Sequence, residues 1–210
     1  MLNSLDSLTR TGRRLQAKSL TTAGRSGKRL PHLLFFTDPV RTPNPEAIIA
    51  RLPRGSGVVF RAFGAADALV QGRKLAILAR RRGLMVFVGA DVGLAIALNA
   101  DGVHMPERLA GRAGVHRALR RRFWLTAAAH SLPAILKSER AGVDALVVSP
   151  VFASQGPSAG RPLGVLAFAR LARLARAPVY ALAGINAGSA KRLMTSGAHG
   201  LAAIDGLMED

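Results

Sequence analysis

Side chains able to bind anions or move protons follow several short apolar runs of this chain. A histidine suits proton transfer near neutral pH because a free imidazole titrates around pH 6.5. A glycine turn that opens a helix offers backbone N–H groups to an anion. The residues of these kinds are Arg61, His104, His130, Ser131 and the turn Gly184-Ile185-Asn186. These residues are therefore candidates for proton transfer and for anion binding.

Eight apolar runs recur from residue 33 onward, and stretches with helical periodicity separate most of them. The runs are Leu33–Thr37, Val58–Phe60, Met85–Val88, Gly102–His104, Trp124–Ala128, Ala145–Ser149, Val179–Leu182 and Gly200–Ile204. They are short and several are rich in β-branched or aromatic residues, which is typical of strands buried on both faces. Eight such units predict an α/β fold, a (β/α)8 TIM barrel, with an open doubly wound sheet as the alternative. No Gly-x-Gly-x-x-Gly turn follows the first run, which argues against dinucleotide binding.

The charge of the chain is strongly positive, at +18, and its placement matters more than its size. Residues 1–30 hold seven basic side chains against one acid and are rich in Ser, Thr and Gly, so we expect a flexible basic extension there. Residues 31–210 are expected to form a single barrel domain. No apolar secretory segment or membrane-length apolar run is present, which predicts a cytoplasmic protein with no membrane partner. The absence of cysteine excludes disulfides and thiolate metal sites.

Arginine clusters account for much of the remaining charge. They are Arg80-Arg81-Arg82, Arg120-Arg121-Arg122, and Arg170, Arg173 and Arg176. Most of these fall near predicted helix C-termini, where cations offset the helix dipole. We therefore expect a solvated belt on the barrel face away from the site. Nucleic-acid binding stays possible but is not favoured, since aromatic residues make up only 5% of the chain.

The order of these segments resembles the thiamine phosphate synthase and TenI-type thiazole tautomerase family over residues 33–207. The pieces that carry the resemblance are Thr37-Asp38, Ala100–His104, His130-Ser131-Leu132, Ser149–Phe152 with Pro162-Leu163-Gly164, and Gly184-Ile185-Asn186. The resemblance implies a small phosphorylated thiazole as substrate, either isomerised or joined to a pyrimidine pyrophosphate in thiamine biosynthesis. It also implies a substrate and phosphate site made of Arg61, His104, Ser131, Ser154, Gly184, Ile185, Asn186 and Gly206.

The metal-binding positions of the synthase branch are altered here. The resemblance implies that the synthase branch holds magnesium with an Asn-Asp pair after the third strand and an acid after the fourth. Gly89-Ala90 stands in the first place, and Asp91 and Glu107 lie close to the two positions without falling on them. Two lysines expected for pyrophosphate are also replaced, one of them by Phe63. We therefore expect no cofactor. Magnesium, held by Asp91 or Glu107, is expected only under the transferase alternative.

His130 fits the tautomerase branch, whose His-Ser-Leu histidine moves the proton. The main hypothesis is therefore a metal-independent isomerase of thiazole phosphate, with His130 as the catalytic residue. A histidine at this place could instead cap the following helix, and His104 could pack at the barrel rim rather than contact substrate. The alternatives are a thiamine phosphate synthase and a non-catalytic ligand-binding relative. Asp205 favours the last of these, because a carboxylate stands where the family prefers a serine near the phosphate.

The last predicted strand ends a few residues before Asp210, so no eighth helix is expected after it. The outer faces of the first and last strands then need a cover. Either the N-terminal segment folds back, offering Leu2, Leu5, Leu8 and Leu15, or a second subunit covers the gap. We expect a homodimer.

Overall fold

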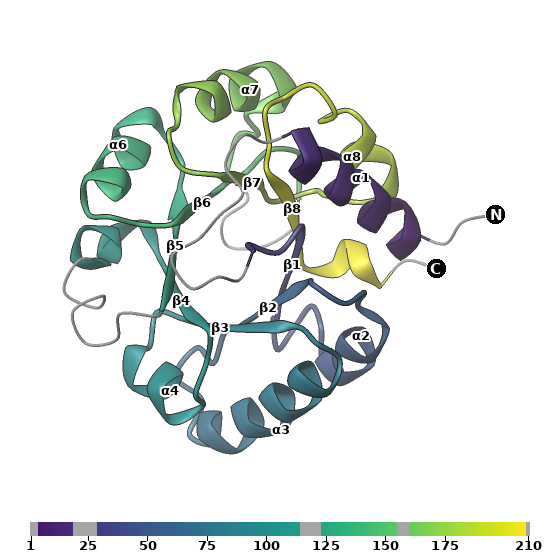
Figure 1. The fold of residues 1–210 in the computed structure, drawn as a ribbon, viewed down its shortest axis with the longest axis vertical. Coiled ribbons are helices and arrows are strands. Elements are labelled where there is room, and N and C mark those ends of the chain that lie inside the picture. Colours follow the sequence, from purple (N-terminus) through teal and green to yellow (C-terminus); the bar gives the residue numbers. More distant parts are fainter. Residues whose placement is uncertain (1–3, 19–28, 114–122, 155–159, 209–210) are drawn as a thin grey trace.

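Eight parallel strands close into a barrel in the computed structural model, which describes residues 4–18, 29–113, 123–154 and 160–208 (Figure 1). The strands are β1 (Leu33–Phe36), β2 (Gly57–Phe60), β3 (Met85–Gly89), β4 (Gly102–Met105), β5 (Trp124–Ala129), β6 (Ala145–Val148), β7 (Val179–Ala181) and β8 (Gly200–Ala203). Each strand pairs with the next, and β8 pairs with β1 in the register Leu34 to Ala202. The predicted (β/α)8 barrel is confirmed.

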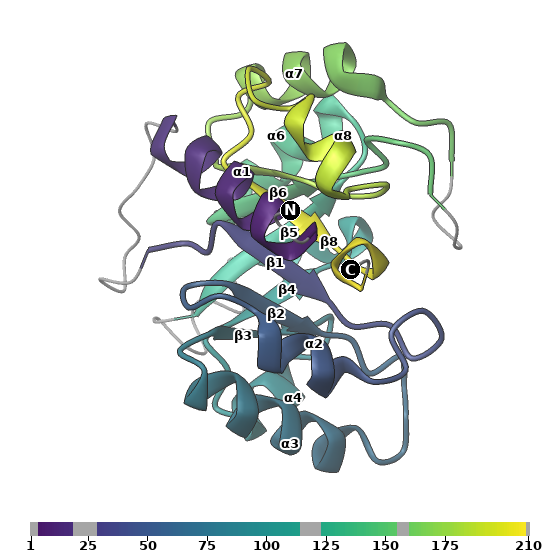
Figure 2. The ribbon, with the colours of Figure 1, turned by 90° about the vertical axis from the view of Figure 1, so that its right-hand side faces the viewer.

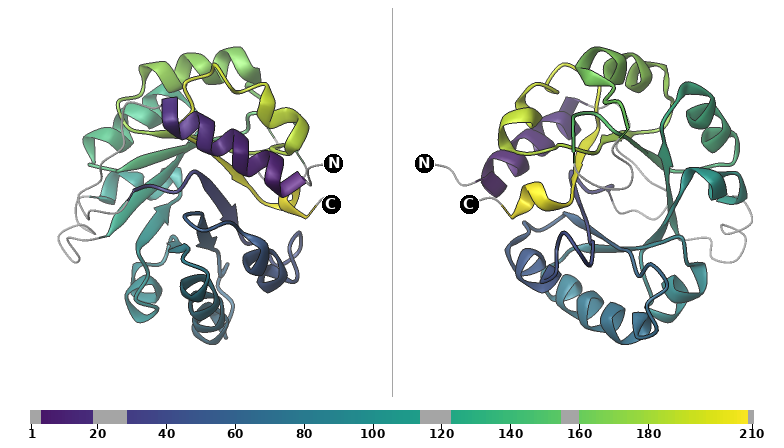
Figure 3. Two further views of the ribbon diagram at one scale, coloured as in Figure 1. Left: turned by 45° about the vertical axis from the view of Figure 1, so that its right-hand side comes forward. Right: turned by 180° about the vertical axis from the view of Figure 1, so that it is seen from behind.

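A ring of helices surrounds the barrel (Figures 1 and 3). The α-helices are α1 (Ser4–Lys18), α2 (Pro45–Arg51), α3 (Ala68–Arg81), α4 (Val92–Ala97), α6 (Leu132–Arg140), α7 (Gly164–Leu174) and α8 (Ala187–Lys191). Two short 3-10 helices, η1 (Glu107–Arg112) and η2 (Asp205–Leu207), follow β4 and β8. Four of the helices begin at side-chain caps, which satisfy otherwise unpaired N–H groups: Asn44, Asp91, Ser131 and Asn186.

Side chains fill the inside of the barrel, so its two ends are the places left for a ligand. The interior cluster consists of Leu30, Leu34, Phe36, Val59, Met85, Phe87, Trp124, Ala145, Val147, Tyr180 and Ala202. A second, larger cluster packs between the strands and the helices, because alternate residues of each strand point outward. Function is therefore expected at the carboxyl ends of the strands, where the βα loops lie.

Helix α1 covers the seam between β8 and β1 (Figures 1 and 2). It occupies the place that a helix following β8 would take in a complete (β/α)8 barrel. Leu5, Leu8 and Leu15 are buried against the barrel. The helix comes so close that a Cβ on Gly12 would lie 2.7 Å from the His32 carbonyl oxygen. The expectation of a flexible extension is therefore wrong for residues 4–18, because their leucines repeat at helical spacing and find an apolar surface. The seam needs no second subunit, and the homodimer stays a prediction.

Arginines of α3 and α7 lie near the C-terminal ends of these helices, as the sequence predicts. Arg80 and Arg81 are in the last turn of α3, and Arg173 is in the last turn of α7. The Arg80 guanidinium also donates to the Asn99 carbonyl at 3.0 Å. Arg120–Arg122 lie outside the described residues. Within the part of the chain that the structure describes, no helix has both the length and the apolarity to cross a membrane.

Candidate functional site

His130 directly follows β5 and is held by two hydrogen bonds. Its Nδ1 lies 2.7 Å from the Ser149 carbonyl oxygen, and its backbone N–H donates to Glu107 Oε2 at 2.9 Å. A carbonyl can only accept, so Nδ1 carries the proton and Nε2 of the neutral ring carries a lone pair. The residue is exposed, so this lone pair belongs to an accessible base.

The helix-capping role considered for His130 belongs to its neighbour. Ser131 is the N-cap of α6, and its hydroxyl accepts the Ala134 N–H at 3.3 Å. The His130 side chain is turned instead toward the loop after β6 through its bond to Ser149. The capping alternative for His130 is therefore not what the structure shows.

Arg61, directly after β2, is a fixed cation at the same end of the barrel. Its Nε donates to the Thr37 carbonyl at 2.7 Å, and a terminal nitrogen pairs with Asp38 Oδ2 at 3.1 Å. The guanidinium also lies over the rings of Phe36, at 5.7 Å, and Phe63, at 5.0 Å. Burial lowers the pKa of Arg61 and the Asp38 charge opposes this, so the guanidinium stays charged and has a set orientation.

His104 packs inside the barrel rather than opening onto the site. Its Nδ1 lies 3.0 Å from the Thr126 hydroxyl, and its ring meets Phe36 edge to face at 4.9 Å. Burial, with a smaller effect of Arg61, lowers the pKa of His104 to about 3, so the ring is neutral near pH 7. The packing alternative therefore describes His104, and the expected substrate contact does not.

The turns after β7 and β8 lie against each other, as a shared phosphate site requires. A Cβ on Gly206 would lie 2.0 Å from the Ile185 carbonyl oxygen, so only glycine permits this approach. Gly184 has φ +62° and faces the Ala153 carbonyl, which brings the loop carrying Ser154 beside it. The structure thus brings Gly184, Gly206 and this loop together.

Two other residues of the predicted phosphate turn are occupied elsewhere. Asn186 caps α8, and its Oδ1 accepts the N–H groups of Gly188 and Ser189 at 3.1 and 2.9 Å. Ile185 is buried, with 4% of its surface exposed. Their side chains therefore shape the turn, and phosphate binding by the backbone of this turn stays a prediction.

Asp205 is neutralised by an arginine that the sequence did not single out. Its Oδ2 lies 2.6 Å from a terminal nitrogen of Arg41, which belongs to the loop after β1. The carboxylate is therefore not an uncompensated charge beside the phosphate turns. The argument from Asp205 for a non-catalytic relative loses its basis.

The carboxylates available for magnesium are used as structural acceptors. Asp91 Oδ1 accepts the Leu94 N–H at 2.8 Å and caps α4, while Glu107 accepts the His130 N–H. No group of three or more His, Asp or Glu residues suited to a metal occurs among the described residues. Magnesium is usually held by one or two carboxylates together with waters and substrate phosphates. Its binding by Asp91 or Glu107 therefore stays a prediction of the transferase alternative.

Strained backbone also marks this end of the barrel. Phe63, Ala90 and Ala183 have φ values of +50°, +63° and +79°, and they follow β2, β3 and β7. Left-handed conformations at non-glycine residues cost free energy and gather at functional sites. Arg41 and these three residues are what sequence reasoning missed as site features. For Ala183, the sequence did offer a signal, because the glycine that follows it indicated a tight turn.

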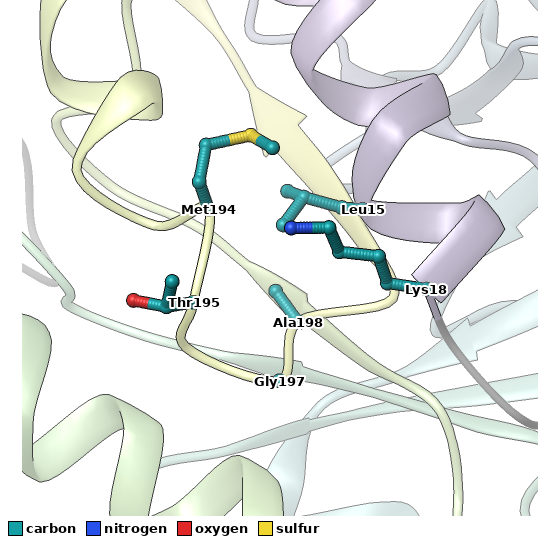
Figure 4. Close-up of a pocket in the computed structure, with 6 residues that line it drawn as sticks. All are labelled: Leu15, Lys18, Met194, Thr195, Gly197 and Ala198. Atoms are coloured by element: carbon teal, nitrogen blue, oxygen red, sulfur yellow. The ribbon is translucent and has the colours of Figure 1, made fainter.

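A pocket of about 230 Å³ lies away from these groups, beside the C-terminal end of α1 (Figure 4). Gly197 and Ala198, in its wall, precede β8, so the pocket belongs to the amino-terminal side of the barrel. Its lining is Leu15, Lys18, Met194, Thr195, Gly197 and Ala198. Its lining contains no histidine or carboxylate, and the chemistry described above does not extend to it.

Comparison with known proteins places this chain in one family. A family model described as thiamine monophosphate synthase matches residues 37–207. The thiamine-phosphate synthase of Chloroflexus aurantiacus is 34% identical over 136 residues, which are 62% of this chain and 61% of that protein. That of Prochlorococcus marinus is 29% identical over 83% of this chain, and the match spans 49% of that protein.

A solved structure has the same fold. Thiamine phosphate pyrophosphorylase from Pyrococcus furiosus superposes with a TM-score of 0.72 at 24% identity, covering 86% of this chain and 91% of that one. At 24% identity, this likeness shows a shared fold and nothing further. In sequence, the chain spans about half to two thirds of the length of the curated relatives reported above.

Proposed function

Because the chain belongs to the thiamine monophosphate synthase family, we propose that it acts on a phosphorylated thiazole in thiamine biosynthesis. The reaction would take place at the carboxyl ends of the strands, between His130 and the turns after β7 and β8. The function that this geometry supports best is metal-independent isomerisation of a thiazole phosphate. The observation that carries the proposal is the Nδ1 bond of His130 to Ser149, which leaves Nε2 as the base.

Isomerisation of a dihydrothiazole needs one proton to leave a ring carbon and one to return at another position. The Nε2 lone pair of His130 would take the first proton and form an imidazolium. The same N–H would then return the proton to the new position, so the net composition of the substrate is unchanged. The Ser149 carbonyl stabilises the imidazolium because a charged donor strengthens the hydrogen bond at Nδ1.

Substrate placement would rest on the backbone and on a positioned cation. The Gly184 and Gly206 turns would face the phosphate, since their lack of side chains lets backbone approach closely. Arg61 would attract the dianion from the neighbouring β2 end, with its orientation held by Thr37 and Asp38. Anchoring the phosphate would keep the thiazole ring within reach of His130.

Thiamine phosphate synthesis is the second candidate, and the names of the relatives favour it over isomerisation. Arg61 is retained at the β2 end, where it suits a pyrophosphate. Against this, the carboxylates near the expected metal positions accept backbone N–H groups, and the two lysines expected for pyrophosphate are replaced.

Two assays on the full chain separate the candidates. The first follows conversion of a dihydrothiazole phosphate to its aromatic isomer by absorbance or proton NMR, in the presence of EDTA. The second follows thiamine phosphate formation from thiazole phosphate and pyrimidine pyrophosphate, with and without magnesium. Isomerisation in EDTA that His130→Asn abolishes supports the main proposal. Magnesium-dependent thiamine phosphate formation with no isomerisation overturns it in favour of the transferase.

A further inference from the structure

An ion pair joins the loop after β1 to the turn after β8. Arg41 and Asp205 are 164 positions apart in the chain, and their closest atoms lie 2.6 Å apart. The Arg41 side chain is 20% exposed and the Asp205 side chain 55% exposed. The guanidinium is thus well shielded, while its carboxylate partner lies at the solvent.

The loop that presents Arg41 is braced without help from Asp205. The Arg41 backbone N–H donates to Asp38 Oδ1 at 3.0 Å. Thr42 closes the loop on itself, with its N–H donating to the Asp38 carbonyl at 2.7 Å and its hydroxyl accepting the Asp38 N–H at 2.8 Å. The base of the Arg41 side chain would therefore stay in place if the ion pair opened.

The pair stands at the border of the two turns that suit a phosphate. Asp205 directly precedes Gly206, whose Cα rests on the Ile185 carbonyl of the β7 turn. Arg41 also lowers the pKa of Arg61 through its charge, so the two guanidinium groups act on the same region. A carboxylate and a phosphate offer a guanidinium the same two-oxygen acceptor.

We propose that Asp205 is an internal substitute for the substrate phosphate, and that Arg41 binds the phosphate once the carboxylate is displaced. This inference deepens the proposed function, since it rests on a phosphate held at the β7 and β8 turns. The pair keeps Arg41 oriented and the site neutral when no ligand is bound. It also weakens binding, because a ligand must displace the carboxylate before it reaches Arg41.

Titration with inorganic phosphate, followed by calorimetry or ³¹P NMR at fixed ionic strength, tests this directly. Asp205→Asn keeps the size of the side chain and removes its charge, so phosphate affinity should rise about fivefold to tenfold. Arg41→Gln should lower affinity by a similar factor, and Arg41→Lys should fall between Arg41→Gln and the unmodified protein. The double variant should bind more tightly than Arg41→Gln, because it removes a carboxylate left uncompensated beside the phosphate. The gain should be smaller than the gain of Asp205→Asn in the unmodified protein, because no guanidinium is released.

Arg80→Gln is the matched control, since it removes the same charge from the far end of α3. Its phosphate affinity should stay within about twofold of the unmodified protein, because exposed charges beyond a Debye length are screened. The inference is overturned if Asp205→Asn leaves affinity unchanged, if Arg80→Gln weakens it as much as Arg41→Gln, or if neither the unmodified protein nor Asp205→Asn binds phosphate.

The same titration separates this inference from the proposed reactions, because phosphate binding requires no turnover. Tightened phosphate binding in Asp205→Asn without either thiazole reaction would leave the ion-pair assignment standing and remove the proposed function. Isomerase activity with unchanged phosphate affinity in both Arg41 and Asp205 variants would do the reverse.

Discussion

Replacing His130 with asparagine tests the proposed proton transfer most directly. Asparagine keeps some hydrogen bonding but lacks a basic nitrogen, so the variant loses the Nε2 lone pair. A positioned general acid–base group contributes about 10²–10⁴-fold to a rate, and turnover should fall by that factor. Substrate affinity should change little, because the phosphate turns and Arg61 are untouched.

The stability cost of His130→Asn should be small by comparison. The side chain makes one short hydrogen bond, from Nδ1 to the Ser149 carbonyl, and is otherwise exposed. Loss of one such bond costs about 0.5–1.5 kcal/mol of unfolding free energy. The rate effect corresponds to about 3–5 kcal/mol of transition-state stabilisation, so the two effects are separable.

Asn44→Ala is a matched control, because it removes a helix cap without touching the site. Asn44 caps α2 through the Ala47 N–H at 3.2 Å, and its loss should cost about 1 kcal/mol with turnover unchanged. Isomerisation rates and urea unfolding of both variants are measured under one buffer condition. If His130→Asn lost about as much stability as Asn44→Ala but kept full turnover, the catalytic assignment of His130 would be refuted.

Three further predictions concern the fold, acid and metal. Leu8→Ala should lower the unfolding free energy by about 2–5 kcal/mol in guanidinium titrations, because Leu8 is fully buried between α1 and the barrel. The control Leu166→Ala, at a side chain 87% exposed, should change it by at most about 0.5 kcal/mol, and equal effects would contradict the docking of α1. The unfolding free energy should also fall from pH 6.5 to pH 5, by roughly 1.5 kcal/mol for each of three buried histidines, because these side chains take up protons in the unfolded state but not in the folded one. An unfolding midpoint that stays constant over this pH range would contradict this prediction. Burial lowers the pKa of these residues to about 4 for His32 and His199 and to about 3 for His104. Finally, EDTA should leave isomerisation and phosphate affinity unchanged, and a strict magnesium requirement in either assay would count against the metal-independent site.

The barrel and the outline of its site could be predicted from the sequence because both depend on local patterns. Strands buried on both faces form continuous apolar runs, and the intervening helices show their own period. Since parallel strands all end at one face, residues that follow the runs had to meet there, as His130 and Gly184 do. The resemblance to the family rested on the same segments.

The helix α1 shows where local patterns mislead. Its basic and small polar residues indicated a flexible extension, whereas Leu5, Leu8 and Leu15 indicated that it folds back on the barrel, as it does. What decides between the two is an apolar surface for those leucines, which exists only after β8 has closed against β1. A short helix in isolation is marginal, and packing supplies most of its stability.

The chemical state of the site was likewise decided by contacts between distant residues. Neither the partner of Asp205 nor the proton position on His130 follows from spacing, because Arg41 and Ser149 reach them across loops of different βα units. Hydrogen bonds and ion pairs depend on distances of a few ångströms and on direction, which a chain acquires only on folding. The residue types and the end of the barrel they occupy thus come from the sequence, while the available base, the neutralised carboxylate and the buried histidine come from the closed barrel.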